Sequence, residues 1–153
     1  MERDVPLIRR LLAAVLLALA VAGVLRVALA ADEARLVLVA AANSPVAPLS
    51  AAEVRRLYLG VPLVQNGREL IPLRNAASPA ATEMFLQHVL FMSAQAYERQ
   101  ISARLYRSGG NRIPEHTDLR TLVEALVTEP FAVSYMPAET AARIPAVKIL
   151  GDL

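Results

Sequence analysis

An unbroken apolar run of fifteen residues, Leu11–Leu25, divides this chain into two unlike parts. Arg9 and Arg10 precede the run, and Ala28-Leu29-Ala30 follows it as the small-x-small pattern that signal peptidase reads. A membrane-spanning helix needs about 20 consecutive apolar residues, so a shorter run closed by Arg26 favours a cleaved signal. The pattern predicts an export signal over residues 1–30 and a periplasmic domain over residues 31–153.

An uncleaved N-terminal anchor is the alternative interpretation. Arg9 and Arg10 would then stay on the cytoplasmic side, so the domain would still face the periplasm. The protein would then contact the membrane only through the uncleaved signal segment.

The charge balance changes once residues 1–30 are removed. They carry four of the 16 basic and two of the 14 acidic residues, which leaves twelve of each and a net charge of zero. A neutral domain gives no case for nucleic-acid binding. The chain has no cysteine, which excludes disulfides, thiolate metal sites, a cysteine nucleophile and a lipid-modified N-terminal cysteine.

Strand and helix patterns alternate along the remaining residues. Strand patterns cover residues 35–42, 69–73, 131–136 and 147–150, and the first is typical of a strand buried on both faces. Helices are expected after the capping residues Ser50, Ser78, Ser93 and Thr117. The glycine-rich stretch 107–116 is expected to be irregular. The pattern predicts one α/β domain of three layers with a largely parallel mixed sheet.

The first of these helices has the most complete local signals. Ser50 and Glu53 form a capping box, and Leu49 can pack on Val54 as a hydrophobic staple. Gly60 is placed to end the helix in a left-handed conformation. At the next helix, Ser78 is the expected N-cap, with a proline at the first helical position.

Four segments of the chain resemble the phosphate-binding proteins of bacterial phosphate ABC transporters. They are Asn43-Ser44-Pro45-Val46, the helix LSAAEVRRLYLG of residues 49–60, RNAASPAATEMF of residues 74–85 and FAVSYM of residues 131–136. The resemblance implies one lobe of a type 2 periplasmic-binding-protein fold. In that family two such lobes close on an oxyanion, which loop amides and hydroxyls hold.

The sequence departs from the family pattern where the anion would bind. Pro79 and Ala80 stand in place of a Gly-Thr pair, which removes one amide hydrogen and one hydroxyl. The acidic residue that the family places before its serine is absent from residues 74–78, and the chain has no tryptophan after Gly60. The chain also covers one lobe, so the opposing wall of a cleft is not evident.

The start of the Ser78 helix is the first candidate anion site. Exposed amides and the positive end of the helix dipole attract anions, and Arg74 adds a cation. Asn75 and Thr82 lie beside it in the sequence. The alternative is an ordinary N-cap without a ligand.

Two further candidates lie in predicted loops. Arg107-Ser108-Gly109-Gly110 can wrap backbone amides around an oxyanion, or can serve as a flexible connection. Asn43 and Ser44 follow the first strand, where open α/β sheets bind ligands, although turn formation explains them equally well.

No catalytic constellation is evident. The spacing of His88 and His116 fits no recognised zinc site, and a partly buried structural role is expected for His88. The Ser-x-Gly at Ser108 lacks the flanking pattern of a nucleophile elbow. We therefore expect a protein that is not an enzyme and needs no cofactor or metal.

Two functions remain open from the sequence. The first is binding of a small oxyanion such as phosphate, with an ABC transporter as partner. The second is a single-lobe interaction or sensor module for an envelope protein, in which ligand binding has been lost. Convergence of Ser44, Ser78 and Ser108 on one pocket would favour the first, and dispersal would favour the second.

Overall fold

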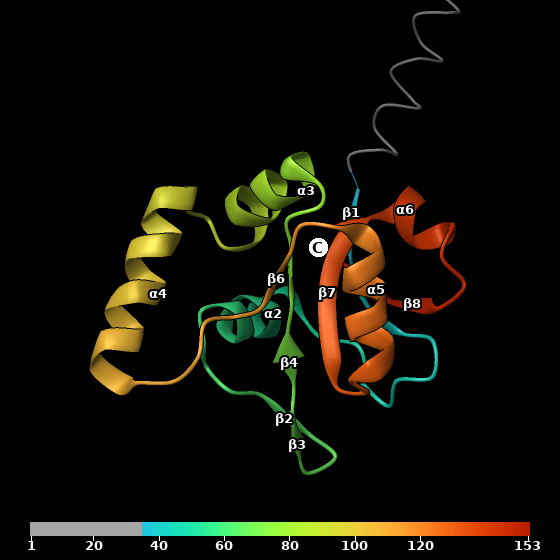
Figure 1. Cartoon of the computed structure of the whole chain (residues 1–153), viewed down its shortest axis with the longest axis horizontal. Coiled ribbons are helices and arrows are strands. Elements are labelled where there is room, and N and C mark those ends of the chain that lie inside the picture. Colours follow the sequence, from blue (N-terminus) through green and yellow to red (C-terminus); the bar gives the residue numbers. More distant parts are fainter. Residues whose placement is uncertain (1–34) are drawn as a thin grey trace, which may run out of the picture. The chain divides into compact units, whose positions relative to one another are not determined.

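A computed structural model gives the structure of residues 35–153, so the predicted export signal and its cleavage site lie outside the described residues. The central sheet contains β1 (Leu36–Ala41), β4 (Ile71–Pro72), β7 (Ala132–Pro137) and β8 (Val147–Asp152). Its strand order is β4-β7-β1-β8. Figure 1 shows β1 and β7 at the centre of this arrangement.

The directions of the strands account for the mixed character of the sheet. β4 and β7 are parallel, whereas β1 is antiparallel to both β7 and β8. Three of the four strands therefore share one direction, but the opposing strand β1 lies between two of them. The three-layer α/β prediction with a mixed sheet is confirmed, but most pairings are antiparallel, because the first strand inserts between two later ones.

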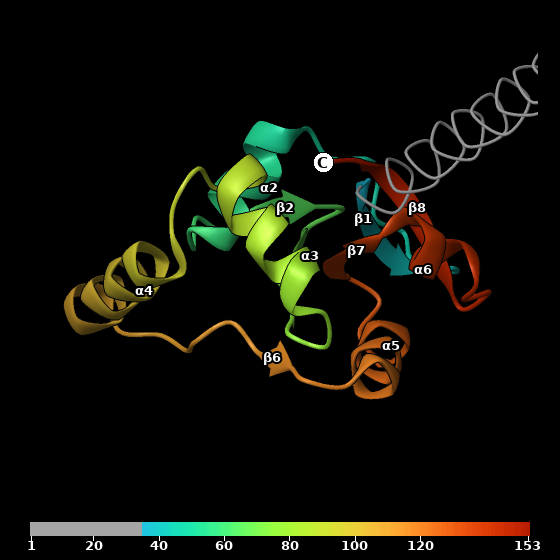
Figure 2. The same cartoon turned by 90° about the horizontal axis from the view of Figure 1, so that it is seen from above.

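Each face of the sheet supports its own hydrophobic core. Leu36, Leu38 and Ala40 of β1 point into one core, and Val37 and Val39 point into the other. This alternation is the two-residue period of a β-strand that is buried on both faces. Figures 1 and 2 show helices on both sides of the sheet, which gives the three layers.

The first core lies beneath α2 (Ala51–Tyr58), α3 (Pro79–Met84), η1 (Phe85–Val89) and α4 (Ala94–Ser108). The second lies beneath α5 (Leu119–Thr128) and α6 (Ala138–Ala142). Among these elements, η1 is a single turn of π-helix that continues α3. The helix expected after Ser78 therefore includes η1, whereas α6 was not predicted from the sequence, because it is short and lacks a capping side chain.

The predicted caps of three helices are confirmed. The Ser50 hydroxyl accepts a hydrogen bond from the Glu53 amide while the Glu53 carboxylate accepts one from the Ser50 amide, as a capping box requires. Ser78 and Ser93 cap α3 and α4 through their own side chains. Gly60 follows α2 with φ of +85° and so adopts the expected left-handed conformation.

The region between α4 and α5 differs from the prediction. The helix α4 continues to Ser108, and Glu115–His116 forms strand β6, which pairs in parallel with β5 (Arg74–Asn75). The stretch 107–116 is thus irregular only in its middle. Asp118, not Thr117, caps α5, because its carboxylate accepts the hydrogen bond from the Thr121 amide.

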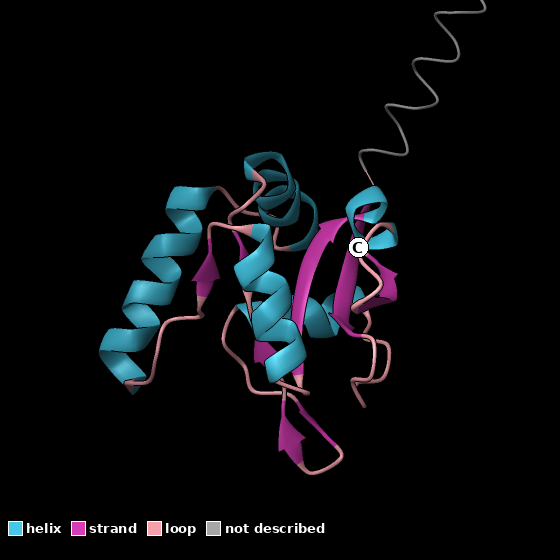
Figure 3. Ribbon diagram, turned by 45° about the vertical axis from the view of Figure 1, so that its right-hand side comes forward, coloured by secondary structure: helices cyan, strands magenta, loops and turns pink. Residues whose placement is uncertain are grey.

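The predicted strand over residues 69–73 is interrupted. Residues Val64–Gln65 and Arg68–Glu69 form a hairpin, β2 and β3, around the turn at Asn66 and Gly67. Only Ile71–Pro72 joins the main sheet. Figure 3 shows this hairpin as a projection away from the layers.

A cluster of tyrosines ties the first core together. The Tyr58 hydroxyl lies 2.9 Å from the Leu73 carbonyl and 3.2 Å from that of Val133, so it joins α2 to neighbouring strands. The rings of Phe85 and Tyr135 stack with 3.9 Å between centroids. Tyr97 of α4 donates to the Tyr58 carbonyl at 3.2 Å. This cluster holds α2, η1 and α4 against the sheet.

Candidate functional site

The candidate residues around Ser78 come together at one edge of the sheet. The chain leaves β4, passes through β5 and reaches Ser78 beside the carboxyl half of β7, where the Asn75 side-chain amide donates to the Tyr135 carbonyl at 2.9 Å. Ser78 is half-buried, and its hydroxyl oxygen accepts from the Ala81 amide at 3.3 Å. The local fold follows from Ser78-Pro79, which starts the helix.

The polar groups beside Ser78 are engaged within the protein. Asn75 is only 1% exposed, and its side-chain oxygen accepts from the Ala77 amide at 3.1 Å. The Thr82 hydroxyl lies 2.6 Å from the Asn75 carbonyl and 3.1 Å from the Ser78 carbonyl. These side chains therefore stabilise the turn before α3 and would have to exchange partners to bind an anion.

Arg74 is paired with two carboxylates. Its Nη1 lies 3.0 Å from Glu98 Oε1 and 2.7 Å from Glu115 Oε2, and its side chain is 18% exposed. The guanidinium also lies over the Tyr97 ring, 5.1 Å from the centroid. Arg112 makes a further ion pair with Glu98 at 2.8 Å. The positive charge of Arg74, which the sequence analysis expected to attract an anion, is thus neutralised by carboxylates of α4 and β6.

The pKa of Glu98 reflects this network. Its hydrogen bond with Arg112 lowers the pKa from the ordinary value, desolvation opposes the change, and the charge of Arg74 adds to the lowering. A depressed pKa in the folded state keeps Glu98 ionised at neutral pH. The carboxylate therefore remains a competitor for Arg74.

A hollow of about 440 Å³ lies next to Ser78. Pro79, Thr82, Leu86 and Met92 contribute to its wall, and Glu83 is the charged residue among those that line it. This carboxylate would repel an oxyanion in the hollow.

Asn43 and Ser44 lie at the other end of β7. The Ser44 hydroxyl donates to the Pro130 carbonyl at 2.6 Å, just before β7, whereas Asn75 contacts Tyr135 within β7. At about 3.3 Å per residue these points are roughly 15 Å apart. Lys148 Nζ donates to the Ser44 carbonyl at 2.6 Å, so Ser44 fixes a turn, and Asn43 is exposed.

The third candidate group lies at the far end of α4. Arg107, Ser108, Gly109 and Gly110 are exposed, and Arg107 Nε donates to the Ala103 carbonyl at 3.2 Å. Gly109 has φ of 67° and ψ of −163°, and Gly110 has φ of 100°. Consecutive residues of this kind do not alternate between right- and left-handed helical conformations, as an anion nest requires.

The structure therefore separates the sequence candidates into three places. Ser78, Arg74, Asn75 and Thr82 are together, Ser44 and Asn43 are at the other end of β7, and the Ser108 group is at the end of a helix. Anion binding by any of them stays a prediction. The carboxylates of Glu98 and Glu115 were missed, because their partner Arg74 is distant from both in the sequence.

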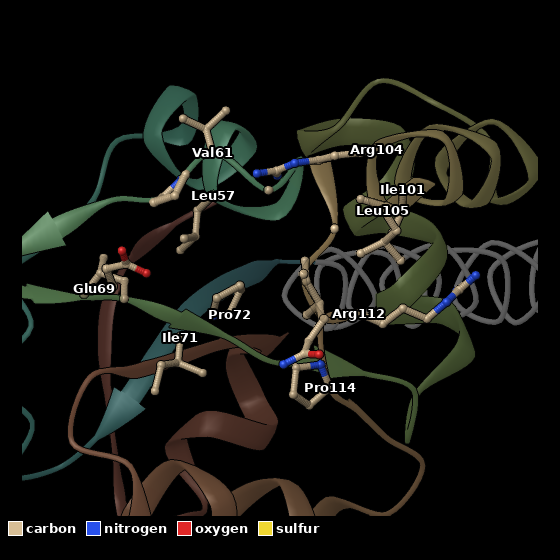
Figure 4. Close-up of a pocket in the computed structure, with 17 residues that line it drawn as sticks. Leu57, Val61, Glu69, Ile71, Pro72, Ile101, Arg104, Leu105, Arg112 and Pro114 are labelled. Carbon is tan, nitrogen blue, oxygen red and sulfur yellow. The ribbon is translucent and has the colours of Figure 1, made fainter. Parts of the chain in front are cut away.

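A separate groove of about 300 Å³ lies between β4, the end of α2 and α4. Figure 4 shows Ile71 and Pro72 on one wall, Ile101 and Leu105 on another, and the Arg104 side chain extended across the top. Apart from the apolar face of α4, no sequence pattern indicated this groove.

No cluster of three or more potential metal-ligating side chains occurs among residues 35–153. His88 is exposed, which corrects the expectation of a partly buried histidine, because η1 turns it away from the apolar face. Within the same described range, no helix combines the length and apolar character needed to cross a bilayer.

Comparisons with known proteins bear on the fold. No protein-family model matches the chain, and no curated protein matches it. Among solved structures, it is similar to an ABC-type phosphate transport receptor from Vibrio cholerae, with a TM-score of 0.55 and 14% sequence identity. The match covers 76% of this chain and 45% of that receptor, so the chain spans about half the receptor's length. The likeness supports a periplasmic-binding-protein-like fold.

Proposed function

We propose that this chain is an exported, non-catalytic lobe of the periplasmic-binding-protein type that acts through contact with an envelope partner. The solved structure to which the chain is similar is a phosphate transport receptor, but the chain spans only about half of that receptor. A cleft receptor excludes water by closing a second wall over its ligand, which strengthens charge-assisted hydrogen bonds. A single lobe supplies one wall.

The observation that carries the proposal is the pairing of Arg74 with Glu98 and Glu115. The cation nearest the Ser78 turn is already neutralised, and Asn75 and Thr82 are hydrogen-bonded to backbone groups. The dispersal of Ser44, Ser78 and Ser108 points the same way. An isolated lobe of this construction is suited to contact, and weakly suited to capture of an anion.

Oxyanion binding completed by a partner is the second candidate function. Ser78, Thr82 and Arg74 still lie together at the sheet edge, and an opposing surface could displace the carboxylates from Arg74. Phosphate would then bind between the two proteins, and an ABC transporter or a second envelope protein would be the partner.

Calorimetric titration of residues 31–153 with phosphate and sulfate separates the two candidates. For the isolated lobe we expect a Kd of about 1 mM or weaker for either anion. Micromolar binding that is lost in Ser78→Ala, with an unchanged melting temperature, would contradict the interaction-module proposal.

Export is tested independently of the ligand. When the protein is expressed in a bacterium with a functional secretion system, we expect it in the periplasmic fraction. Its intact mass should be that of a chain that begins at Ala31. Retention of residues 1–30 in the membrane fraction would instead support the anchor.

A further inference from the structure

The groove between β4 and α4 is distinct from the Ser78 turn in position and in chemistry. Its walls include Leu57, Ile71, Ile101, Leu105 and Ile113, all of them aliphatic. Ile101 is 7% exposed and Leu57 is 2% exposed, so these side chains are held in fixed positions by the first core. The aliphatic part of the groove is therefore preformed.

Its backbone has no free strand edge for a peptide to pair with. The amide of Leu70 donates to the Leu63 carbonyl and that of Arg74 donates to the Pro114 carbonyl. Between these two residues, the strand edge that faces the groove is occupied by Pro72, which has no amide hydrogen. The groove consequently suits a ligand that binds through apolar contact instead of main-chain hydrogen bonds.

A guanidinium is fixed at the mouth of the groove. Arg104 Nη1 donates to the Leu59 carbonyl at 3.0 Å, and the side chain passes directly over Gly60. A Cβ atom at Gly60 would meet this guanidinium, so the glycine provides the space for it. Arginine has several N–H donors in a planar fork, and one of its nitrogens is engaged here. The remaining N–H groups of Arg104 can donate hydrogen bonds to a carboxylate.

The volume of the groove sets the size of a ligand. About 300 Å³ is at the lower end of small-molecule sites. At about 30 Å³ for each heavy atom, as for water, it holds about ten heavy atoms. A protein partner would instead need about 800 Å² on each side.

We propose that this groove binds a small amphipathic carboxylate, with its alkyl chain on the aliphatic walls and its carboxylate on Arg104. The carboxylate anion of a medium-chain fatty acid has this combination of size, apolar chain and charge. The site uses neither Arg74 nor Ser78, so it stands or falls separately from the proposed function.

Octanoate is the probe, titrated calorimetrically into residues 31–153 below the concentration at which it forms micelles. We expect saturable binding with a Kd on the order of 0.1–1 mM. Hexanoate should bind about fifteenfold more weakly, because each buried methylene is worth about fourfold in affinity. Octylammonium, which has the same chain with the opposite charge, should bind at least about tenfold more weakly than octanoate.

Two variants connect the binding to the groove. Arg104→Gln is expected to lower octanoate affinity about tenfold while leaving the dependence on chain length intact. Leu105→Gln should reduce the dependence on chain length and retain the preference for the anion. The matched control is Arg99→Gln, an exposed arginine of the same helix that does not line the groove. Folding of each variant is checked by its melting temperature.

Three results would overturn the proposal. They are the absence of saturable binding, octylammonium binding as strong as octanoate binding, and equal affinities of Arg104→Gln and Arg99→Gln for octanoate. Octylammonium preference would assign the charge selectivity to Glu69, which also lines the groove.

Discussion

Arg104 Nη1 lies 3.0 Å from the carbonyl oxygen of Leu59, the C-cap of α2. The last carbonyls of a helix lack partners within the helix, and a cation there is favoured by the helix dipole. The bond joins α4 to the end of α2, although the two helices are distant in the sequence. Gly60 allows this bond for two reasons. Its φ of +85° suits glycine, and its lack of a Cβ atom leaves the space that the guanidinium occupies.

Substitution of Gly60 by alanine should therefore cost more stability than substitution of Gly67. Both glycines have positive φ, but a Cβ at Gly67 meets no atom within 4 Å, whereas one at Gly60 collides with Arg104. We expect Gly67→Ala to cost about 1–2 kcal/mol from backbone strain. Gly60→Ala should cost at least about 1 kcal/mol more, because the hydrogen bond to Leu59 is lost. Urea unfolding of the two variants measures the difference.

The Arg104 background provides the control for this comparison. In Arg104→Ala the collision is absent, so Gly60→Ala should cost about as much as Gly67→Ala there. An unchanged gap between the two glycine variants would show that Arg104 is not the cause.

The apolar face of α2 gives a second test. Leu57 is 2% exposed in the first core, whereas the Arg55 guanidinium lies over the exposed Phe91 ring, 5.1 Å from its centroid. Leu57→Ala is expected to lower the free energy of unfolding by about 2–5 kcal/mol. Arg55→Ala should lower it by no more than about 0.5–1 kcal/mol, the range for an exposed cation–π contact. Similar urea midpoints for the two variants would contradict the placement of the buried face.

Local sequence signals were sufficient for much of the fold. The caps at Ser50 and Ser78 depend on residues three apart, so the sequence shows them without knowledge of tertiary contacts. The burial of β1 on both faces is likewise visible in its continuous apolar run. In contrast, its insertion between β7 and β8 depends on pairing with strands from the other end of the chain, which the sequence does not indicate.

The candidate site was harder to predict for the same reason. The Ser78 turn was located because its N-cap is local, and the neighbours Asn75 and Thr82 are close in sequence. The ion pairing of Arg74 was not predicted, because Glu98 and Glu115 approach it only after α4 and β6 have folded against β5. A formal count of charges cannot show that a cation is already paired.

The tyrosine cluster predicts loss of stability at alkaline pH. Burial is the main cause that raises the pKa of Tyr97 to about 12 and that raises the pKa of Tyr58 well above its ordinary value near 10. Because these folded-state pKa values exceed the unfolded ones, the stabilisation is fully present below about pH 10 and is lost as the pH rises through the folded values. Urea midpoints should therefore fall between about pH 10 and pH 12.

A matched pair of variants assigns this effect. Tyr97→Phe should be less stable than the parent at pH 8, because its hydroxyl donates to the Tyr58 carbonyl, and should lose less stability on going to pH 11. Tyr106→Phe is the control, since that ring is 93% exposed. Equal alkaline slopes for the parent and Tyr97→Phe would exclude Tyr97 as a source of the pH dependence.

The ion pairs of Arg74 lead to the last prediction, which concerns phosphate. Glu98 and Glu115 place two negative charges at the guanidinium, and both carboxylates are 42% exposed. At partly exposed positions each such interaction is worth about 0.5–1 kcal/mol. If the Ser78 turn retains an anion site, Glu98→Gln with Glu115→Gln should strengthen phosphate binding about five- to thirtyfold, since about 1.4 kcal/mol is tenfold. Calorimetric titration measures the gain.

Two controls give this experiment its meaning. Glu124→Gln removes an exposed carboxylate from α5 and should leave phosphate affinity unchanged, which accounts for the change in net charge. Adding Arg74→Gln to the double variant should reverse the gain, because the freed guanidinium is its source. If the double variant folds with a cooperative transition and binds phosphate no better than the parent, Arg74 masking does not limit anion binding. The lobe would then lack an oxyanion site for reasons other than charge, such as the amide that Pro79 removes.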